Sequence, residues 1–276
     1  MYDVVIVYRT YPRFGRLAFV QPGWTKYDLV RVCLKSLLKS LEGINFKFHV
    51  VLDGCPSEYR DLFEELIDAS RLKVTDLPGG GQAASVAEGI RIIEQESESD
   101  VVYFAEDDYL YKDSAMTEML EMIRDEDADF VTPYDHPDYY QRTLDPTKPA
   151  YLVRLHDYRS EIIFKRRHWR TVSSTTMTFL TKKVVLKKAA KYIKLTSTTR
   201  LVDYPMWLTL TKMRKRTVRI RGTLYLYALA WPRMIVGRSF KLWSPMPSLA
   251  THMVGPYMAP GFEWEDLIRK YAAKSA

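Results

Sequence analysis

The chain has 276 residues, and 47% of them are hydrophobic, which is enough for one large domain or two closely packed lobes and argues against disorder. Its 2 cysteines provide no disulfide framework and suit a reducing compartment. No apolar stretch is long enough to span a bilayer, and the first residues lack the basic leader of a signal peptide. A cytoplasmic protein is therefore expected.

The net charge of +7 conceals a strong asymmetry between the two halves of the sequence. Residues 1–161 contain 18 Lys and Arg against 30 Asp and Glu, whereas residues 162–276 contain 23 against 4. Solvated helix faces, such as the lysine-rich segment 182–194, account for part of the basic excess. The remainder favours polyanions as partners, among them diphosphates, nucleic acid and the lipid phosphates of a membrane to which the protein would bind peripherally.

Strand and helix patterns alternate along the first 110 residues. Strands are predicted at 3–8, 47–54, 72–77 and 100–106, and helices at 26–43, 57–70 and 82–96. This alternation predicts an α/β fold whose parallel sheet has right-handed crossovers, and ligands of such sheets bind beyond the carboxyl ends of the strands. The residues expected at that edge are Tyr8, Arg9, Thr10, Asp53, the glycine turn 79–81 and Glu106 to Asp108.

The alternation weakens after residue 110. The patterns there predict a helix at 114–124, a short strand at 128–133, a strand and a helix within 175–193, a helix at 204–215, one or two strands within 217–230, a Pro- and Gly-rich loop at 238–262 and a final short helix. The Tyr- and Pro-rich connection 135–160 has no assignable structure. No internal repeat is evident, so a single domain is preferred.

Three consecutive carboxylates, Glu106, Asp107 and Asp108, end the fourth predicted strand. Like charges within a few ångströms raise one another's pKa, so such a cluster is costly unless a cation lies among them. Carboxylate oxygens suit Mg²⁺ or Mn²⁺, which usually keep several waters and share their ligand shell with substrate phosphates. The residues alone leave a structural alternative open, in which the triplet is an acidic strand end that leads into the next helix.

The segment "GGGQAASVAEGI" joins a flexible glycine turn to the start of a helix. Free backbone N–H groups and the helix dipole favour an anion there, with Gly81, Gln82 and Ser85 as candidate contacts. The segment is neither a Walker A loop nor a G-x-G-x-x-G fingerprint, which argues against a nucleoside triphosphatase and an ordinary dehydrogenase.

Taken in order, "VYRTYPR", "VVLDG", "GQAASVAEGI" and "VYFAEDD" resemble segments of the GT-A fold glycosyltransferases, which take a sugar from a nucleoside diphosphate. The resemblance covers the first 110 residues well and the rest more loosely. It implies one GT-A (Rossmann-like) α/β domain with a mixed, mostly parallel central sheet flanked by helices. Residues 1–112 would form its nucleotide-sugar-binding half, and residues 113–276 its acceptor-binding and catalytic half.

The same resemblance implies roles for the acidic triplet, because "EDD" looks like the form of the D-x-D motif found in N-acetylglucosaminyltransferase relatives. Asp108 would bind Mn²⁺ or Mg²⁺, while Glu106 and Asp107 would face the ribose or the sugar. Asp53 would contact the base or the ribose, with Arg9 and Thr10 nearby.

The later segment "SPMPSLATHMVG" resembles a PSLxxHxG segment that follows the catalytic core in several GT-A families. The histidine of that segment reaches back to the metal or the diphosphate, so His252 would be the second protein ligand of the metal. A loop histidine with a purely structural partner is the alternative that the residues leave open.

Asp203 in "LVDYPMW" lies where inverting GT-A enzymes carry the carboxylate that acts as general base. Its basic surroundings are expected to keep Asp203 ionised near pH 7, so that it accepts a proton from an acceptor hydroxyl. The structural alternative is an N-cap for the following helix. Inversion of configuration is expected if Asp203 is the base, and retention becomes an option if it is a cap.

The reaction expected from these features is attack of an acceptor hydroxyl on the anomeric carbon of a UDP- or GDP-linked sugar. The acceptor would be a glycan, a lipid-linked molecule or a protein, and Arg9, Arg233, Arg238 or Lys241 would add positive charge near the diphosphate. A sugar nucleotidyltransferase is an alternative, although "YRTYPRFGR" fits its Gly-rich signature poorly. A basic nucleic-acid-binding protein is another, and the acidic N-terminal half argues against it.

Overall fold

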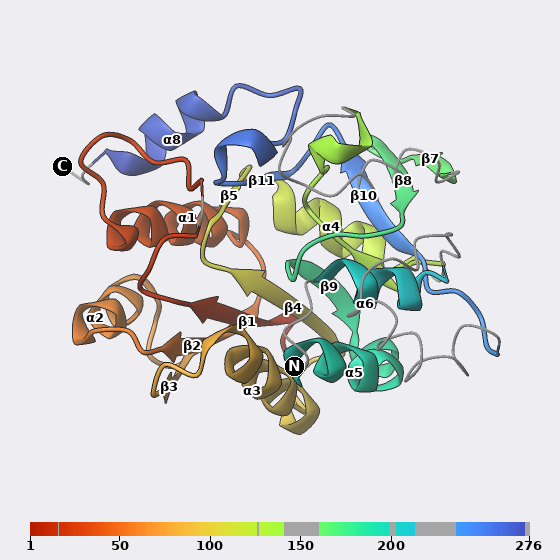
Figure 1. Cartoon of the computed structure of the whole chain (residues 1–276), viewed down its shortest axis with the longest axis horizontal. Coiled ribbons are helices and arrows are strands. Elements are labelled where there is room, and N and C mark those ends of the chain that lie inside the picture. The colour runs from red at the N-terminus through yellow and green to blue at the C-terminus, as the bar shows by residue number, and fades with distance from the viewer. Residues whose placement is uncertain (16, 126, 141–159, 199–202, 213–235, 274–276) are drawn as a thin grey trace.

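The computed structural model describes residues 1–140, 160–198, 203–212 and 236–273, except residues 16 and 126. A central sheet crosses the molecule, and helices pack on both of its faces (Figure 1). Among the described residues, no helix is both long enough and apolar enough to cross a membrane.

The first four strands are β1 (Val4–Thr10), β2 (Phe46–Asp53), β3 (Leu72–Leu77) and β4 (Val101–Glu106). They are parallel and lie in the order β3-β2-β1-β4. Every residue of β1 and β2 is buried, as expected for parallel strands covered on both faces, and the buried Lys47 and His49 of β2 both pair with Glu96. The strand order changes direction between β1 and β4, and this places a crevice at the carboxyl ends of these two strands.

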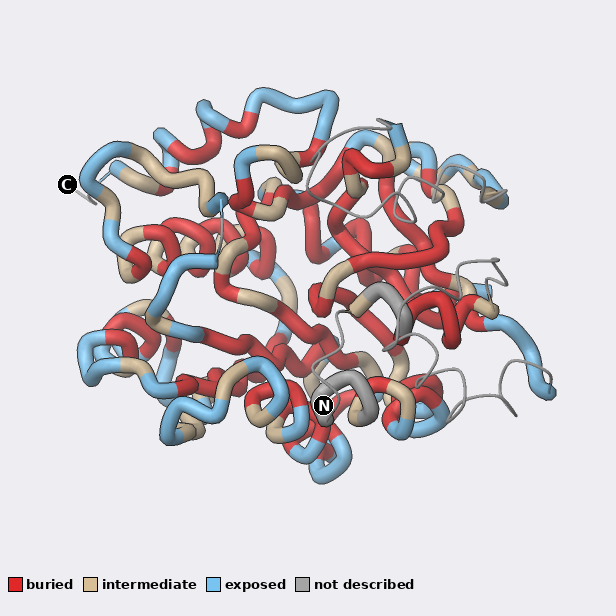
Figure 2. Tube along the Cα trace, in the orientation of Figure 1, coloured by how far each residue is buried: buried red, intermediate tan, exposed pale blue. Residues whose placement is uncertain are grey.

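Helices α1 (Lys26–Ser40), α2 (Ser57–Leu66) and α3 (Gly81–Gln95) connect these strands. A capping box between Thr25 and Asp28 fixes the start of α1. α1 and α2 pack against one face of the sheet, whereas α3 and α5 (Lys183–Thr198) pack against the other. Figure 2 shows the sheet strands buried between these two layers.

The sheet continues past β4 in the order β9 (Phe179–Lys182), β6 (Phe130–Val131), β10 (Leu242–Met246), β8 (His168–Val172) and β7 (Ile162–Phe164). β9 and β8 run against the direction of the other strands. The sheet is therefore mixed with most strands in one direction, which confirms the predicted α/β fold class. Because β4 pairs with β9, the sheet is continuous across residue 112, and the functional division at that boundary stays a prediction.

Short elements complete the described part of the chain. They are β5 (Tyr109–Tyr111), α4 (Ala115–Ile123), the 3-10 turns η1 (Pro137–Tyr139) and η3 (Gly255–Tyr257), α6 (Asp203–Leu210), β11 (Ala250–His252) and α8 (Trp264–Ala272). β5 and β11 form a separate antiparallel pair.

The loop predicted at 238–262 is wrong, because β10 and β11 lie within it. Pro245 argued against a strand, since proline cannot donate to a ladder, yet β10 is an inner strand in which Pro245 lies opposite Trp169. At Pro245 the strand pairs with β8 alone, because the pairing of β10 with β6 is limited to Leu242 and Trp243. The strands predicted within 217–230 lie outside the described residues.

Candidate active site

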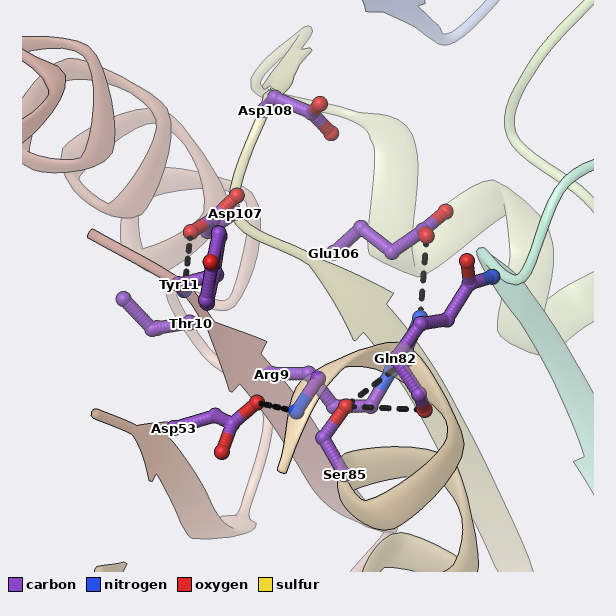
Figure 3. A pocket seen from close by; sticks show the side chains of 10 residues that line it. Arg9, Thr10, Tyr11, Asp53, Gln82, Ser85, Glu106, Asp107 and Asp108 are labelled. Atoms are coloured by element: carbon purple, nitrogen blue, oxygen red, sulfur yellow. Dashed lines mark hydrogen bonds and ion pairs between the residues drawn. The ribbon is translucent and has the colours of Figure 1, made fainter. Parts of the chain in front are cut away.

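A cavity of about 380 Å³ opens at the carboxyl ends of β1 and β4, in the crevice where the strand order changes direction. The residues that line it come from the ends of β1, β2 and β4 and from the start of α3 (Figure 3). They are Arg9, Thr10, Tyr11, Asp53, Gly81, Gln82, Ser85, Glu106, Asp107 and Asp108. Apart from Tyr11, each was a candidate from the sequence, so the structure brings this set together.

Asp108, which directly precedes β5, pairs with His252 of β11. Its Oδ2 lies 3.1 Å from His252 Nε2, while its buried Oδ1 has no hydrogen-bond partner among the described residues. Burial opposes ionisation of Asp108, but the imidazole outweighs it and holds the pKa of the carboxyl below its usual range. In turn Asp108 overcomes the effect of burial on His252 and raises the pKa of the imidazole. The two side chains therefore attract each other strongly.

Glu106 is held by two other elements. Its Oε1 accepts from Arg9 at 2.9 Å, and its Oε2 accepts from the Thr178 hydroxyl at 3.2 Å. Burial raises the pKa of Glu106, and Arg9 opposes that shift. Arg9 is itself buried, and its Nε lacks a partner in the part of the chain that the structure describes. Thr178 was not anticipated, because nothing in its sequence surroundings distinguishes it from the other threonines of 171–178.

Asp107 is fully engaged by protein groups. Its Oδ1 accepts from Lys26 at 2.7 Å, and its Oδ2 accepts from the backbone N–H of Tyr11 at 2.9 Å. Burial lowers the pKa of Lys26, but the attraction of Asp107 and Asp108 outweighs burial and raises it. Lys26 thus neutralises part of the acidic triplet from the first turn of α1. No sequence signal marked this lysine, because it begins a helix at a position where a solvated cation is ordinary.

Asp53 holds the glycine turn. Its two carboxylate oxygens accept from the backbone N–H groups of Gly80 at 2.8 Å and Gly81 at 2.6 Å. The turn needs glycine, because Gly81 has a φ of 78° and a Cβ on Gly80 would lie 2.5 Å from the Cβ of Ala84. The N–H of Gly81, a predicted contact of an anion, is therefore bound by a protein carboxylate, as is that of Gly80. The predicted contact of Asp53 with a base or ribose stays a prediction.

Asp203 is the first residue of α6 and contacts Gln82, a residue of the cavity lining, from the other half of the chain. Its Oδ1 accepts from Gln82 Nε2 at 3.4 Å. Burial first, and then the charge of Glu106, raise the pKa of Asp203 to about 7, against the opposing effect of Arg9 and His252. The expectation that basic neighbours keep Asp203 fully ionised is therefore corrected. A carboxyl with a pKa near neutrality is suited to proton transfer.

Some predicted contacts lie elsewhere. Tyr8 is fully buried, and its ring packs against Phe48 and Phe63 in the core, so the polar end of β1 begins at Arg9. Arg238 pairs with Asp129 and Lys241 with Asp127, which commits both cations to protein carboxylates. Arg233 lies outside the described residues.

Ion pairs between the two halves of the chain balance part of the charge asymmetry of the sequence. Basic side chains of the C-terminal half pair with acids of the N-terminal half, as in Arg167 with Glu118, Arg170 with Asp135, Lys194 with Glu94, and Arg166 with Glu121. A net charge per half therefore overstates the charge that is free to attract polyanions.

The donor atoms of the Asp108–His252 pair fit a divalent cation. A buried carboxylate oxygen without a partner in the described part of the chain is an anomaly that a cation would remove, and carboxylate oxygens suit Mg²⁺ or Mn²⁺, while imidazole is a common metal ligand. Within the described ranges, no group of three or more His, Cys, Asp or Glu side chains converges into a complete metal site. A cation held by these two residues would keep room for waters and phosphate oxygens, as is usual for Mg²⁺.

A Rossmann-like α/β sheet with an acid-lined cavity at its crevice is the architecture of the GT-A glycosyltransferases. Residues 22–188, more than half of the chain, match the glycosyl transferase family 2 model, and the chain belongs to this family. It is therefore a glycosyltransferase. The match includes Asp53, the glycine turn and the acidic triplet, whereas Asp203 and His252 lie beyond it.

Two solved structures are similar over most of the chain. The galactosyltransferase LgtC, in complex with donor and acceptor sugar analogs, has 11% identity and a TM-score of 0.48 over 97% of this chain and 95% of its own. S. aureus TarS 1-349, in complex with UDP-GlcNAc, has 12% identity and a TM-score of 0.45 over 83% of this chain and 72% of its own. No curated protein is similar enough in sequence to match.

Proposed function

We propose that this glycosyltransferase moves a sugar from a UDP- or GDP-linked donor to an acceptor hydroxyl, with a divalent metal at Asp108 and His252 and with Asp203 as general base. One observation carries the proposal. Two residues of the cavity lining lead to the other half of the chain: Asp108, whose Oδ1 has no partner among the described residues, pairs with His252, and Gln82 donates to Asp203, a carboxyl whose pKa is raised to about 7.

The transfer of the sugar moves one proton to Asp203 and one electron pair to the leaving group. Asp203 accepts the proton of the acceptor hydroxyl while the hydroxyl oxygen bonds to the anomeric carbon. The bond from that carbon to the diphosphate oxygen breaks, and the nucleoside diphosphate leaves with the electron pair. Since attack comes from the face opposite the leaving group, the configuration inverts. A bound Mn²⁺ or Mg²⁺ supplies positive charge to the diphosphate.

The arrangement of residues supports a division of labour between the two halves. The side chains that line the cavity all come from residues 1–112, which fits donor binding, whereas Asp203 and His252 come from residues 113–276. Arg9 adds a buried positive charge at the cavity wall. The acceptor is a glycan, a lipid-linked molecule or a protein, and a basic surface of the C-terminal half would permit peripheral contact with a membrane.

The test is a thermal-shift screen of nucleoside diphosphates with and without Mn²⁺. We expect a metal-dependent rise in melting temperature with UDP or GDP, and its loss in Asp108→Ala. Asp113→Ala is the matched control, because Asp113 is a half-exposed carboxylate that pairs with Lys270 outside the cavity. An Asp108→Ala protein that keeps the rise would refute the metal assignment. The anomeric configuration of the product, measured by NMR, tests inversion.

A further inference from the structure

Tyr109 follows the acidic triplet directly and supports the imidazole of His252. In the β5–β11 ladder the two residues are opposite each other. Their rings are stacked, with centroids 4.8 Å apart and planes inclined by only 3°. Tyr109 is fully buried, and Tyr134 packs edge-on against it with centroids 5.6 Å apart. The imidazole therefore lies against a ring that cannot rotate freely.

The hydroxyl of Tyr109 connects this residue to a different part of the chain. It forms a hydrogen bond of 2.7 Å with the Thr176 hydroxyl. The carbonyl oxygen of Thr176 accepts from Trp207 Nε1 at 3.1 Å. Trp207 belongs to α6 and follows Asp203 by four residues, which places both side chains on the same face of that helix.

The far end of this connection is rigid. Trp207 is fully buried, and its indole packs edge-on against Phe130 and Phe179, each with a centroid distance of 5.2 Å. These two rings belong to β6 and β9 of the central sheet. A chain of contacts therefore links His252 through Tyr109, Thr176 and Trp207 to the helix that carries Asp203.

We propose that Tyr109 is a positioning residue with two separable functions. Its ring orients His252 toward the metal, and its hydroxyl fixes the placement of the Asp108–His252 pair relative to Asp203. The inference rests on the proposed function, because it concerns the residues that would hold the metal and the base. For fast transfer, the metal ligands and the base must be held within a fraction of an ångström of their productive positions. A hydrogen-bonded aromatic residue between the two meets that requirement.

The two functions are tested with different substitutions. Tyr109→Leu removes the ring, whereas Tyr109→Phe removes only the hydroxyl, and Thr176→Val removes the partner of that hydroxyl. Tyr103→Phe is the matched control, because it also deletes a buried tyrosine hydroxyl, which forms a hydrogen bond of 2.9 Å with Tyr111 and does not contact His252.

Mn²⁺ affinity is measured from the EPR signal of free Mn²⁺, with UDP or GDP as the added nucleotide, and turnover is measured with the nucleotide sugar that the screen identifies. We expect Tyr109→Leu to weaken Mn²⁺ binding about tenfold or more, since supporting groups of metal ligands have effects of that size. Tyr109→Phe and Thr176→Val should keep Mn²⁺ affinity within about twofold and lower kcat about tenfold at unchanged donor KM. Their double variant should be no slower than either single one.

Wild-type Mn²⁺ affinity in Tyr109→Leu, or a kcat for Tyr109→Phe equal to that of Tyr103→Phe, overturns the inference. If Tyr109→Leu does not fold, Tyr109→Phe and Thr176→Val still decide the function of the hydroxyl. A wild-type protein that binds no Mn²⁺ with either nucleotide overturns the proposed function together with this inference. If the wild-type protein binds Mn²⁺ and the variants match it in Mn²⁺ affinity and kcat, this inference alone is overturned.

Discussion

Asp107 and Asp108 are neighbours in the chain and have different surroundings. Asp107 is buried and accepts from the Lys26 ammonium and the Tyr11 N–H with its two oxygens. Asp108 has a neighbouring imidazole on one oxygen and no described partner on the other. Figure 3 shows Asp107 directed toward Tyr11 and Asp108 directed away from it. A run of carboxylates is thus two kinds of site, one satisfied by the protein and one able to accept a further ligand.

The difference has a physical cause. A buried carboxylate needs compensating charge and hydrogen bonds, and Asp107 obtains both from α1 and β1. Asp108 obtains charge from His252, but one of its oxygens has no partner among the described residues, which is costly unless a cation binds there. Asp107 is therefore expected to contribute to stability, and Asp108 to metal binding and turnover.

The most direct way to break this comparison is Asp108→Asn, which keeps the shape and removes the charge. We expect turnover to fall about a thousandfold, because charge stabilisation at the leaving group is lost. Asp107→Asn should lower turnover far less and lower the melting temperature more. Equal losses of turnover in the two variants, measured with the same donor, would contradict the distinction.

Asp203→Asn should lower turnover about a hundredfold or more, since the proton acceptor is removed. The same change should raise the melting temperature at pH 8. Because the pKa of Asp203 is raised to about 7, its ionised form is disfavoured in the fold, and asparagine removes that cost. An ordinary structural carboxylate would behave in the opposite way, with a loss of stability.

The pH dependence follows from the same residue. A base must be deprotonated, so turnover should rise as the pH increases through about 7. The contribution of Asp203 to the free energy of unfolding should decrease over the range from its unfolded pKa, near 4, up to about 7. A turnover profile that is flat from pH 5 to 8 would argue against Asp203 as the base.

Lys26→Met sharpens the comparison by removing the cation that pairs with Asp107. Breaking a buried ion pair leaves an uncompensated charge, so we expect a loss of about 3 to 5 kcal/mol in the free energy of unfolding. The double variant Lys26→Met with Asp107→Leu should regain much of that loss. Lys39→Met is the control, because the pair of Lys39 with Glu42 is exposed and contributes little to stability. Denaturant unfolding measures the free energy of unfolding of these three variants.

Asp53→Asn is expected to have the smallest effect. Asparagine keeps one carbonyl oxygen for the glycine turn and loses the second acceptor, so the free energy of unfolding should fall by about 1 kcal/mol. If Asp53 also contacts the donor, the KM for the nucleotide sugar should rise while kcat is retained. An unchanged KM would leave Asp53 with its structural function alone.

The order of strands and helices in the first half could be predicted because the signals are local. Apolar runs, apolar residues at helical intervals and the glycine turn each act within a few residues. Polar residues after parallel strands then meet at one edge, which is why nearly all of the cavity lining was found in advance. The second half was harder, because β10 and β11 form through pairing with distant strands despite Pro245.

By itself, the sequence determined the α/β class, the edge at which the site lies and the residue types present there. The tertiary structure decided which partner each carboxylate has. Lys26 and Asp107 are separated by 81 positions, and Asp108 and His252 by 144. Such pairings depend on the path of the whole chain, because local propensities fix a strand or a helix but not the element that comes to lie beside it.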